Sequence, residues 1–155
     1  MGKEAQNQAR KLGMMNLPRY TFYCQPRKMK SKFSRQKPDI AYLIENWIKE
    51  IEPQSIINEA GSGGRSSRYY FLAPQSGIYI ELIDRMAGTI VYNPNNHVNK
   101  LDVFTNNQDY VKALVKGING IHDDGILPHL NLKKLEKKFK VKGEDIINSW
   151  NSFLQ

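Results

Sequence analysis

The segment between Pro38 and Pro53 constrains the fold more strongly than any other part of the sequence. Its apolar residues recur at intervals of three and four positions, and polar residues lie between them. The recurring apolar residues are Ile40, Leu43, Ile44, Trp47, Ile48 and Ile51. This spacing predicts an amphipathic helix with one buried face. Asp39 favours a helix start beside the positive end of the helix dipole, and Pro53 ends the helix.

Short segments rich in aromatic and β-branched residues predict strands. The segment 19–24 is the first of them. Segments 69–73 and 78–83 flank the turn residues 74–77, so they predict a β-hairpin. Segment 88–92 predicts a further strand of the same meander.

Helical spacing returns in the second half of the chain, at residues 107–118 and in the C-terminal region. The C-terminal apolar stripes are Leu132, Leu135 and Phe139 in one helix, and Ile146, Ile147, Trp150, Phe153 and Leu154 in the next. Segments 3–15 and 54–60 show no decisive pattern. We predict an α+β fold, with a small antiparallel sheet of three or four strands, about four packed helices and a C-terminal helical hairpin.

The basic charge is concentrated at the N-terminal end. Residues 1–37 hold ten basic residues and one acidic residue, a net charge of +9, whereas residues 38–155 sum to −1. A length of 155 residues is typical of one domain. We therefore predict a basic N-terminal segment, 1–37, made of the strand and a basic loop, and a single globular α+β body, 38–155. A concentrated positive potential attracts polyanions.

The basic segment also contains aromatic side chains, a combination that suits nucleic acid. Cations neutralise phosphates, and aromatic rings stack on unpaired bases. The predicted nucleic-acid-binding residues are Arg19, Tyr20, Arg27, Lys28, Lys30, Lys32, Phe33, Arg35 and Lys37, together with Arg65 and Arg68. Six phosphate contacts on duplex DNA would give a slope of log affinity against log salt of roughly −5. The alternative is that the aromatic residues pack in a strand and the lysines only solvate a tail.

The glycine-rich stretch 61–64 precedes Arg65 and Arg68 but is not a nucleotide-binding loop. A predicted strand follows it instead of a helix, and it lacks the lysine of a P-loop. Two roles stay open for this loop: the two arginines clamp a phosphate backbone, or the loop only connects its neighbours.

The C-terminal hairpin resembles a helix-turn-helix in the spacing of its apolar residues. The resemblance rests on Leu132, Leu135, Phe139, Val141, Ile146 and Trp150. The chain departs from that family at Glu136 and Lys140, where a small residue and a glycine are usual. Glu144 and Asp145 would bring negative charge toward phosphates. The sequence therefore favours a plain helical hairpin.

One loop contains the residue types that bind metals, namely His122, Asp123, Asp124 and His129. Their order resembles that of HNH nucleases. The polar character of a loop and the capping of a helix by Asn131 explain the same residues without chemistry. Glu81 and Asp84 lie three positions apart on a predicted strand, where alternation sends them to opposite faces. We assign no catalytic or metal-ligating residue and expect no cofactor.

The cysteine content and the short apolar stretches of the sequence disfavour several classes of protein. A lone Cys24 cannot form an internal disulfide, and no cysteine and histidine array suits structural zinc. The N-terminus has no apolar signal region, and no apolar stretch approaches the roughly 18 residues that cross a bilayer. These features predict a soluble, cytoplasmic protein without membrane contact.

We expect a nucleic-acid-binding protein that grips phosphates through its N-terminal segment, with DNA and RNA both open as ligands. The composition also suits a protein of a virus or mobile element, and the binding role requires no enzymatic activity. Two alternatives come from other classes. One is a metal-dependent nuclease that uses the loop containing His122, and the other is an inhibitor or adaptor that binds a protein partner.

Overall fold

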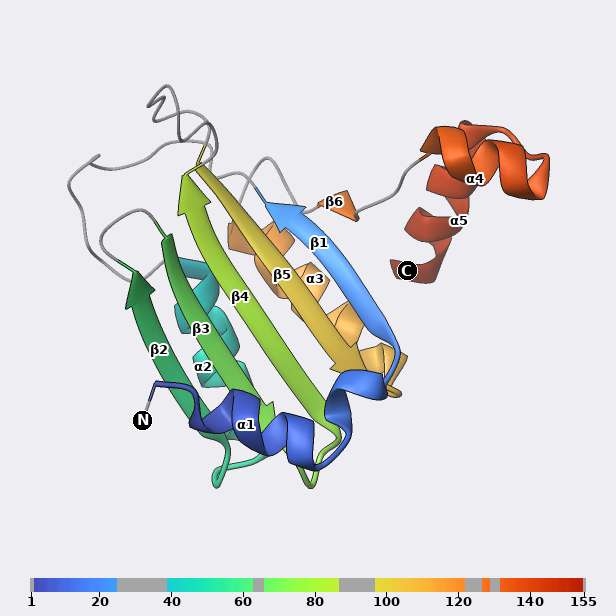
Figure 1. Cartoon of the computed structure of the whole chain (residues 1–155). Helices are drawn as coiled ribbons and strands as arrows, with labels where there is room; N and C mark the ends of the chain where they lie inside the picture. Colours follow the sequence, from blue (N-terminus) through green and yellow to red (C-terminus); the bar gives the residue numbers. More distant parts are fainter. Residues whose placement is uncertain are drawn as a thin grey trace.

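The computed structural model describes residues 2–24, 39–62, 66–86, 97–121, 127–128 and 132–154. These residues form one antiparallel sheet of six strands in the order β2-β3-β4-β5-β1-β6 (Figure 1). The strands are β1 (Arg19–Cys24), β2 (Ile56–Ser62), β3 (Ser66–Ala73), β4 (Ile78–Met86), β5 (His97–Thr105) and β6 (Leu127–Pro128). β2 to β5 form a meander, and β1 lies between β5 and β6.

Helices lie on both faces of this sheet. α1 (Glu4–Lys11) and the short 3-10 helix η1 (Met14–Asn16) cross one face, and α2 (Asp39–Ile51) and α3 (Gln108–Ile121) cover the other (Figure 1). α4 (Leu132–Phe139) and α5 (Gly143–Leu154) form a hairpin beyond the β6 edge. None of the helices in the described parts of the chain is both long and apolar enough to cross a membrane.

The chain is an α+β protein, but the predicted architecture is wrong. The sheet has five long strands and the two-residue β6, in place of three or four strands. Three helices, α1, α2 and α3, pack on it, whereas about four were expected. The prediction omitted β2 and β5 because polar residues interrupt their apolar pattern. The strand expected at 88–92 lies outside the described residues.

Other predicted elements form where the sequence placed them. β1 spans Arg19–Cys24, the β3–β4 hairpin turns at residues 74–77, and α2 ends at Ile51 before Pro53. α3 begins at Gln108, one residue after the predicted start, and the two C-terminal helices are present. These are the elements whose own residues show a regular spacing of apolar side chains or a strong turn signal.

Two apolar clusters hold the layers together. The larger one packs α2 and α3 on the sheet and includes Ile44, Phe71 and Leu114, each at most 1% exposed. Trp47 and Tyr110 join these helices through an edge-to-face contact with ring centroids 5.5 Å apart. The smaller cluster packs α1 and η1 against Tyr70, Leu72, Tyr79 and Phe104. The α1 layer covers only part of its face, so polar side chains further along the strands stay accessible.

Candidate functional site

On the face that carries α1, the strand register arranges side chains in three rows that cross the sheet. Residues directly opposite each other on antiparallel strands point to the same face. The first row is apolar and packs against α1 and η1; it contains Ile56, Leu72, Tyr79 and Phe104. These apolar residues fix α1 to the sheet.

The second row is polar, and several of its groups bond to one another or to α1. It runs through Asn58, Tyr70, Glu81, Asp102 and Thr21. The backbone N–H of Ala5 donates to Asn58 Oδ1 at 2.6 Å, which ties the first turn of α1 to β2. The Thr21 hydroxyl donates to Asp102 Oδ1 at 2.5 Å, and Lys100 Nζ lies 3.8 Å from Asp102 Oδ2.

Glu81 and Asp102 are directly opposite each other on β4 and β5, where like charges repel. The repulsion is offset because each carboxylate has its own donors. Glu81 Oε1 accepts from the Tyr79 hydroxyl at 2.6 Å and from the Gln6 amide at 3.2 Å. Burial and this hydrogen bond to Glu81 raise the pKa of Tyr79 above its ordinary value, so Tyr79 retains the proton that it donates. Both carboxylates therefore serve the fold.

The third row carries basic and aromatic side chains. It runs from Arg68 on β3 through Ile83 on β4 and Lys100 on β5 to Tyr23 on β1. Arg68 is exposed, and the other three residues are half-buried. Tyr23 pairs in turn with Leu127 of β6, so the row reaches the edge of the sheet. At a strand spacing of about 4.8 Å, the distance from Arg68 to Tyr23 is about 14 Å.

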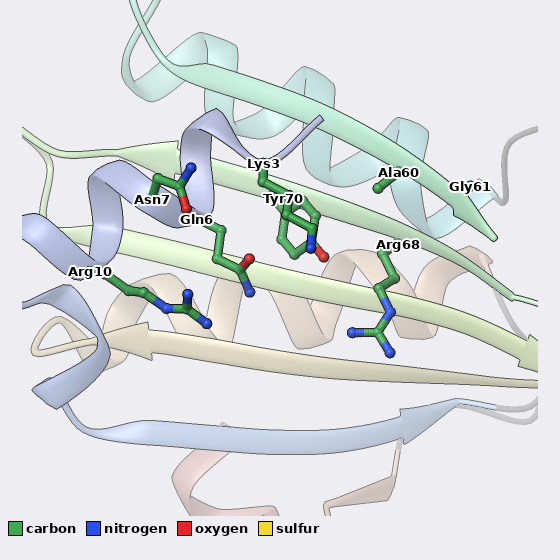
Figure 2. Close-up of a pocket in the computed structure, with 8 residues that line it drawn as sticks. All are labelled: Lys3, Gln6, Asn7, Arg10, Ala60, Gly61, Arg68 and Tyr70. Carbon is green, nitrogen blue, oxygen red and sulfur yellow. The ribbon is translucent and has the colours of Figure 1, made fainter. Parts of the chain in front are cut away.

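A groove of about 750 Å³ lies at the Arg68 end of the third row, between α1 and the strands β2 and β3 (Figure 2). Its lining residues are Lys3, Gln6, Asn7 and Arg10 from α1 and the turn before it, and Ala60, Gly61, Arg68 and Tyr70 from the strands. The first four share one helical face because they recur at intervals of three and four positions. On another face of α1, Ala5 and Ala9 are fully buried, and their small side chains let the helix lie close to the sheet.

The groove is positively charged, and none of the described residues that line it is acidic. Lys3, Arg10 and Arg68 are exposed, and none of them pairs with a carboxylate of the described residues. Figure 2 shows the guanidinium groups of Arg10 and Arg68 on either side of the Gln6 amide. Tyr70 is only 3% exposed, so its ring has little surface for stacking. The arrangement suits an anion held by cations and amides.

The opposite layer of the molecule lacks this charge imbalance. Among the side chains that the structure describes, the accessible charged ones on α2 and α3 are three acidic and three basic: Glu45, Glu50, Asp109, Lys49, Lys112 and Lys116. Lys49 Nζ also lies 3.5 Å from Glu45 Oε1, one helical turn away. Of the two helix layers that cover the sheet, the α1 layer therefore has the more concentrated unpaired positive charge.

Three of the predicted nucleic-acid-binding residues fall in the described chain, and they lie in different places. Arg68 belongs to both the third row and the groove. Arg19 is exposed on the same sheet face but sits opposite Phe104, at the other end of β1 from Tyr23. Tyr20 packs against the core under α2 and α3. The other predicted residues lie outside the described residues: Arg27, Lys28, Lys30, Lys32, Phe33, Arg35, Lys37 and Arg65.

No group of three or more His, Cys, Asp or Glu side chains in the described residues is arranged to hold a metal ion. Glu81 faces α1, where it meets Gln6. Asp84 faces the opposite side, where Tyr69 belongs to the core under α2 and α3. Burial raises the pKa of the Tyr69 hydroxyl, and the negative charge of Asp84 adds to this shift. As strand alternation predicts, the two carboxylates do not share a site. The metal-ligand types His122, Asp123, Asp124 and His129 lie outside the described residues.

Two contributors to this surface, α1 and Lys100, were not predicted from the sequence. The polar residues of α1 could have predicted a helix with one basic face, because they recur with a helical period: Lys3, Gln6, Asn7 and Arg10. Lys100 was missed because its strand, β5, was not predicted.

Comparisons with protein-family models, with curated proteins and with solved structures found no match to this chain.

Proposed function

We propose that this protein binds single-stranded DNA or RNA on the sheet face beside α1. The third row carries the proposal because it places a guanidinium, an aliphatic side chain, an ammonium and an aromatic ring in one line across the sheet face. Cations neutralise backbone phosphates, and aromatic rings on a sheet stack on unpaired bases. The groove extends this path with Arg10 and Lys3.

A single strand suits this surface better than a duplex. A duplex keeps its bases stacked inside and presents phosphates and groove edges to a protein. A half-buried ring on a sheet face, such as Tyr23, then has no base to stack on. An unpaired strand offers both phosphates for Arg68 and free base faces for Tyr23.

Arg68 has the central role in this proposal. It is exposed, it has no carboxylate partner among the described residues, and it belongs to both the row and the groove. Lys100 should contribute less, because the carboxylate of Asp102 at 3.8 Å already compensates part of its charge. Arg10 faces the same groove from α1.

The proposal also includes the basic segment that follows β1 in the chain. Segment 25–38 begins two residues after Tyr23, and its predicted phosphate contacts are Arg27, Lys28, Lys30, Lys32, Arg35 and Lys37. The cytoplasmic location and the origin in a virus or mobile element stay predictions from the sequence.

Fluorescence anisotropy with labelled single-stranded DNA and RNA at about 0.1 M salt tests the proposal. Arg68→Gln should weaken binding about fivefold, because one phosphate contact on a single strand is worth roughly that factor at this salt concentration. The control is Lys116→Gln, which removes the same charge from an exposed position on α3. It should bind like the wild-type protein.

Two results would contradict the proposal. One is equal affinity of Arg68→Gln and the wild-type protein for single strands. The other is no binding by the wild-type protein at about 0.05 M salt, where phosphate contacts are strongest.

A further inference from the structure

The C-terminal hairpin carries a second group of cations. Residues 133–142 contain six lysines and one acidic residue, Glu136. The lysines whose side chains the structure describes are all exposed: Lys133, Lys137, Lys138, Lys140 and Lys142. None of them pairs with a carboxylate of the described residues. The group is therefore available to an external anion.

This group follows the end of the third row. β6 pairs with Phe22 and Tyr23 of β1, and α4 begins four residues after Pro128. Figure 1 shows the hairpin beyond the β6 edge, and α5 makes its contact with α3. A nucleic-acid strand that passes Tyr23 and leaves the sheet at this edge approaches the hairpin next.

Lys140, which follows α4, has an unfavourable backbone conformation. Its φ is 56°, and no other residue of the described chain except glycine has a positive φ. Glycine or asparagine usually occupies this place after a helix, because a larger side chain crowds the backbone there. The sequence keeps a lysine at a strained and exposed position, which points to a use for its charge.

The acidic residues of the hairpin restrict how it can meet a polyanion. Glu144 and Asp145 are exposed in the first turn of α5, where the helix dipole favours them. They repel phosphates, so the contact must be made by α4 and the turn 140–142. A helix-turn-helix protein uses the opposite arrangement, since its second helix enters the major groove.

We propose that α4 and its turn form a second contact for the same nucleic-acid strand, made with phosphates. The inference rests on the proposed function, because the groove and the third row supply the first contact. Two linked contacts raise the affinity only for a strand long enough to reach both. Because phosphates carry no sequence information, the second contact adds affinity without sequence preference.

Anisotropy with oligonucleotides of about 4 and about 16 nucleotides tests the second contact. The test variant carries Lys133→Gln, Lys137→Gln and Lys138→Gln. For the longer strand, its slope of log affinity against log salt should be shallower by about 2, because each contact contributes about 0.7. Its binding of the shorter strand should be unchanged. The matched control, Lys49→Gln with Lys112→Gln and Lys116→Gln, should bind both strands like the wild-type protein.

The possible results separate the two proposals. If the α4 variant binds the longer strand like the wild type while Arg68→Gln weakens both lengths, the second contact is refuted and the proposed function stands. If Arg68→Gln has no effect at either length, the proposed function itself fails. An equal loss for both lengths in the α4 variant would contradict the two-contact arrangement.

Lys140→Gly separates the charge of this residue from its effect on the fold. Glycine relieves the left-handed backbone, so the midpoint of thermal unfolding, followed by circular dichroism, should rise. Affinity for the longer strand should fall about fivefold at about 0.1 M salt, because one phosphate contact is lost. A variant with a raised midpoint and wild-type affinity would refute a role for the Lys140 side chain in binding.

Discussion

Glu52 joins the end of α2 to the β3–β4 turn through one buried carboxylate. It is 7% exposed, and its Oε1 accepts hydrogen bonds from the backbone N–H of Ser76 at 2.7 Å and from the Ser76 hydroxyl at 2.9 Å. Hydrogen bonds to a charged group contribute about 1.5–3 kcal/mol each. Because Glu52→Ala removes both bonds, we expect it to lower the free energy of unfolding by about 3 kcal/mol or more in urea denaturation.

The matched control for this residue is Glu50→Ala. Glu50 is exposed on the same helix, two positions earlier, and removing it deletes the same charge. Its effect on the free energy of unfolding should stay within about 0.5 kcal/mol. Equal losses in the two variants would show that the charge on the last turn of α2, and not the bonds to Ser76, determines the stability.

At the scale of elements, the sequence predicted those that bury an apolar face of their own and missed those stabilised by distant polar partners. β5 contains Asn99, Lys100 and Asp102, which interrupt its strand pattern. Asp102 accepts a hydrogen bond from the hydroxyl of Thr21, 81 positions away. This bond can form only when β1 lies beside β5. Asn58 in β2 likewise accepts from Ala5, 53 positions away. A local pattern cannot show either bond.

The same reasoning explains how much of the candidate site was predictable. Arg68 was predicted because it follows a glycine-rich stretch before a strong hairpin signal. Arg10 was not, since α1 contacts the sheet mainly through Ala5 and Ala9, which give almost no apolar periodicity. The alignment of Arg68, Lys100 and Tyr23 depends on the register of three strand pairs, which the sequence does not specify.

The close packing of α1 leads to a prediction at this scale. Ala9 is fully buried against the sheet, so Ala9→Leu forces α1 outward and should lower the free energy of unfolding by about 1–3 kcal/mol. Because α1 forms one wall of the groove, single-strand affinity should fall as well. Urea denaturation and anisotropy on the same sample measure both effects.

Ala113→Leu is the control for this change. Ala113 is exposed on α3, so the larger side chain meets solvent, and the free energy of unfolding should change by less than about 0.5 kcal/mol. Wild-type affinity in an Ala9→Leu protein that is destabilised but folded would show that the position of α1 does not matter for binding.

At the scale of the whole molecule, the position of the charge should matter more than its total. The chain has a net charge of +8, and two double variants, Arg10→Gln with Arg68→Gln and Lys49→Gln with Lys116→Gln, both reduce it to +6. If the net charge alone attracted a polyanion, the two double variants would bind a single strand with equally reduced affinity.

The two variants differ in where they remove charge. The first removes both arginines from the groove, while the second changes only the α2 and α3 side of the sheet. A salt titration of single-strand binding should therefore give the first variant a slope shallower by about 1.4, two contacts at about 0.7 each, and leave the slope of the second unchanged. Equal slopes in the two variants would assign binding to the overall charge and remove the α1 side of the sheet as the site.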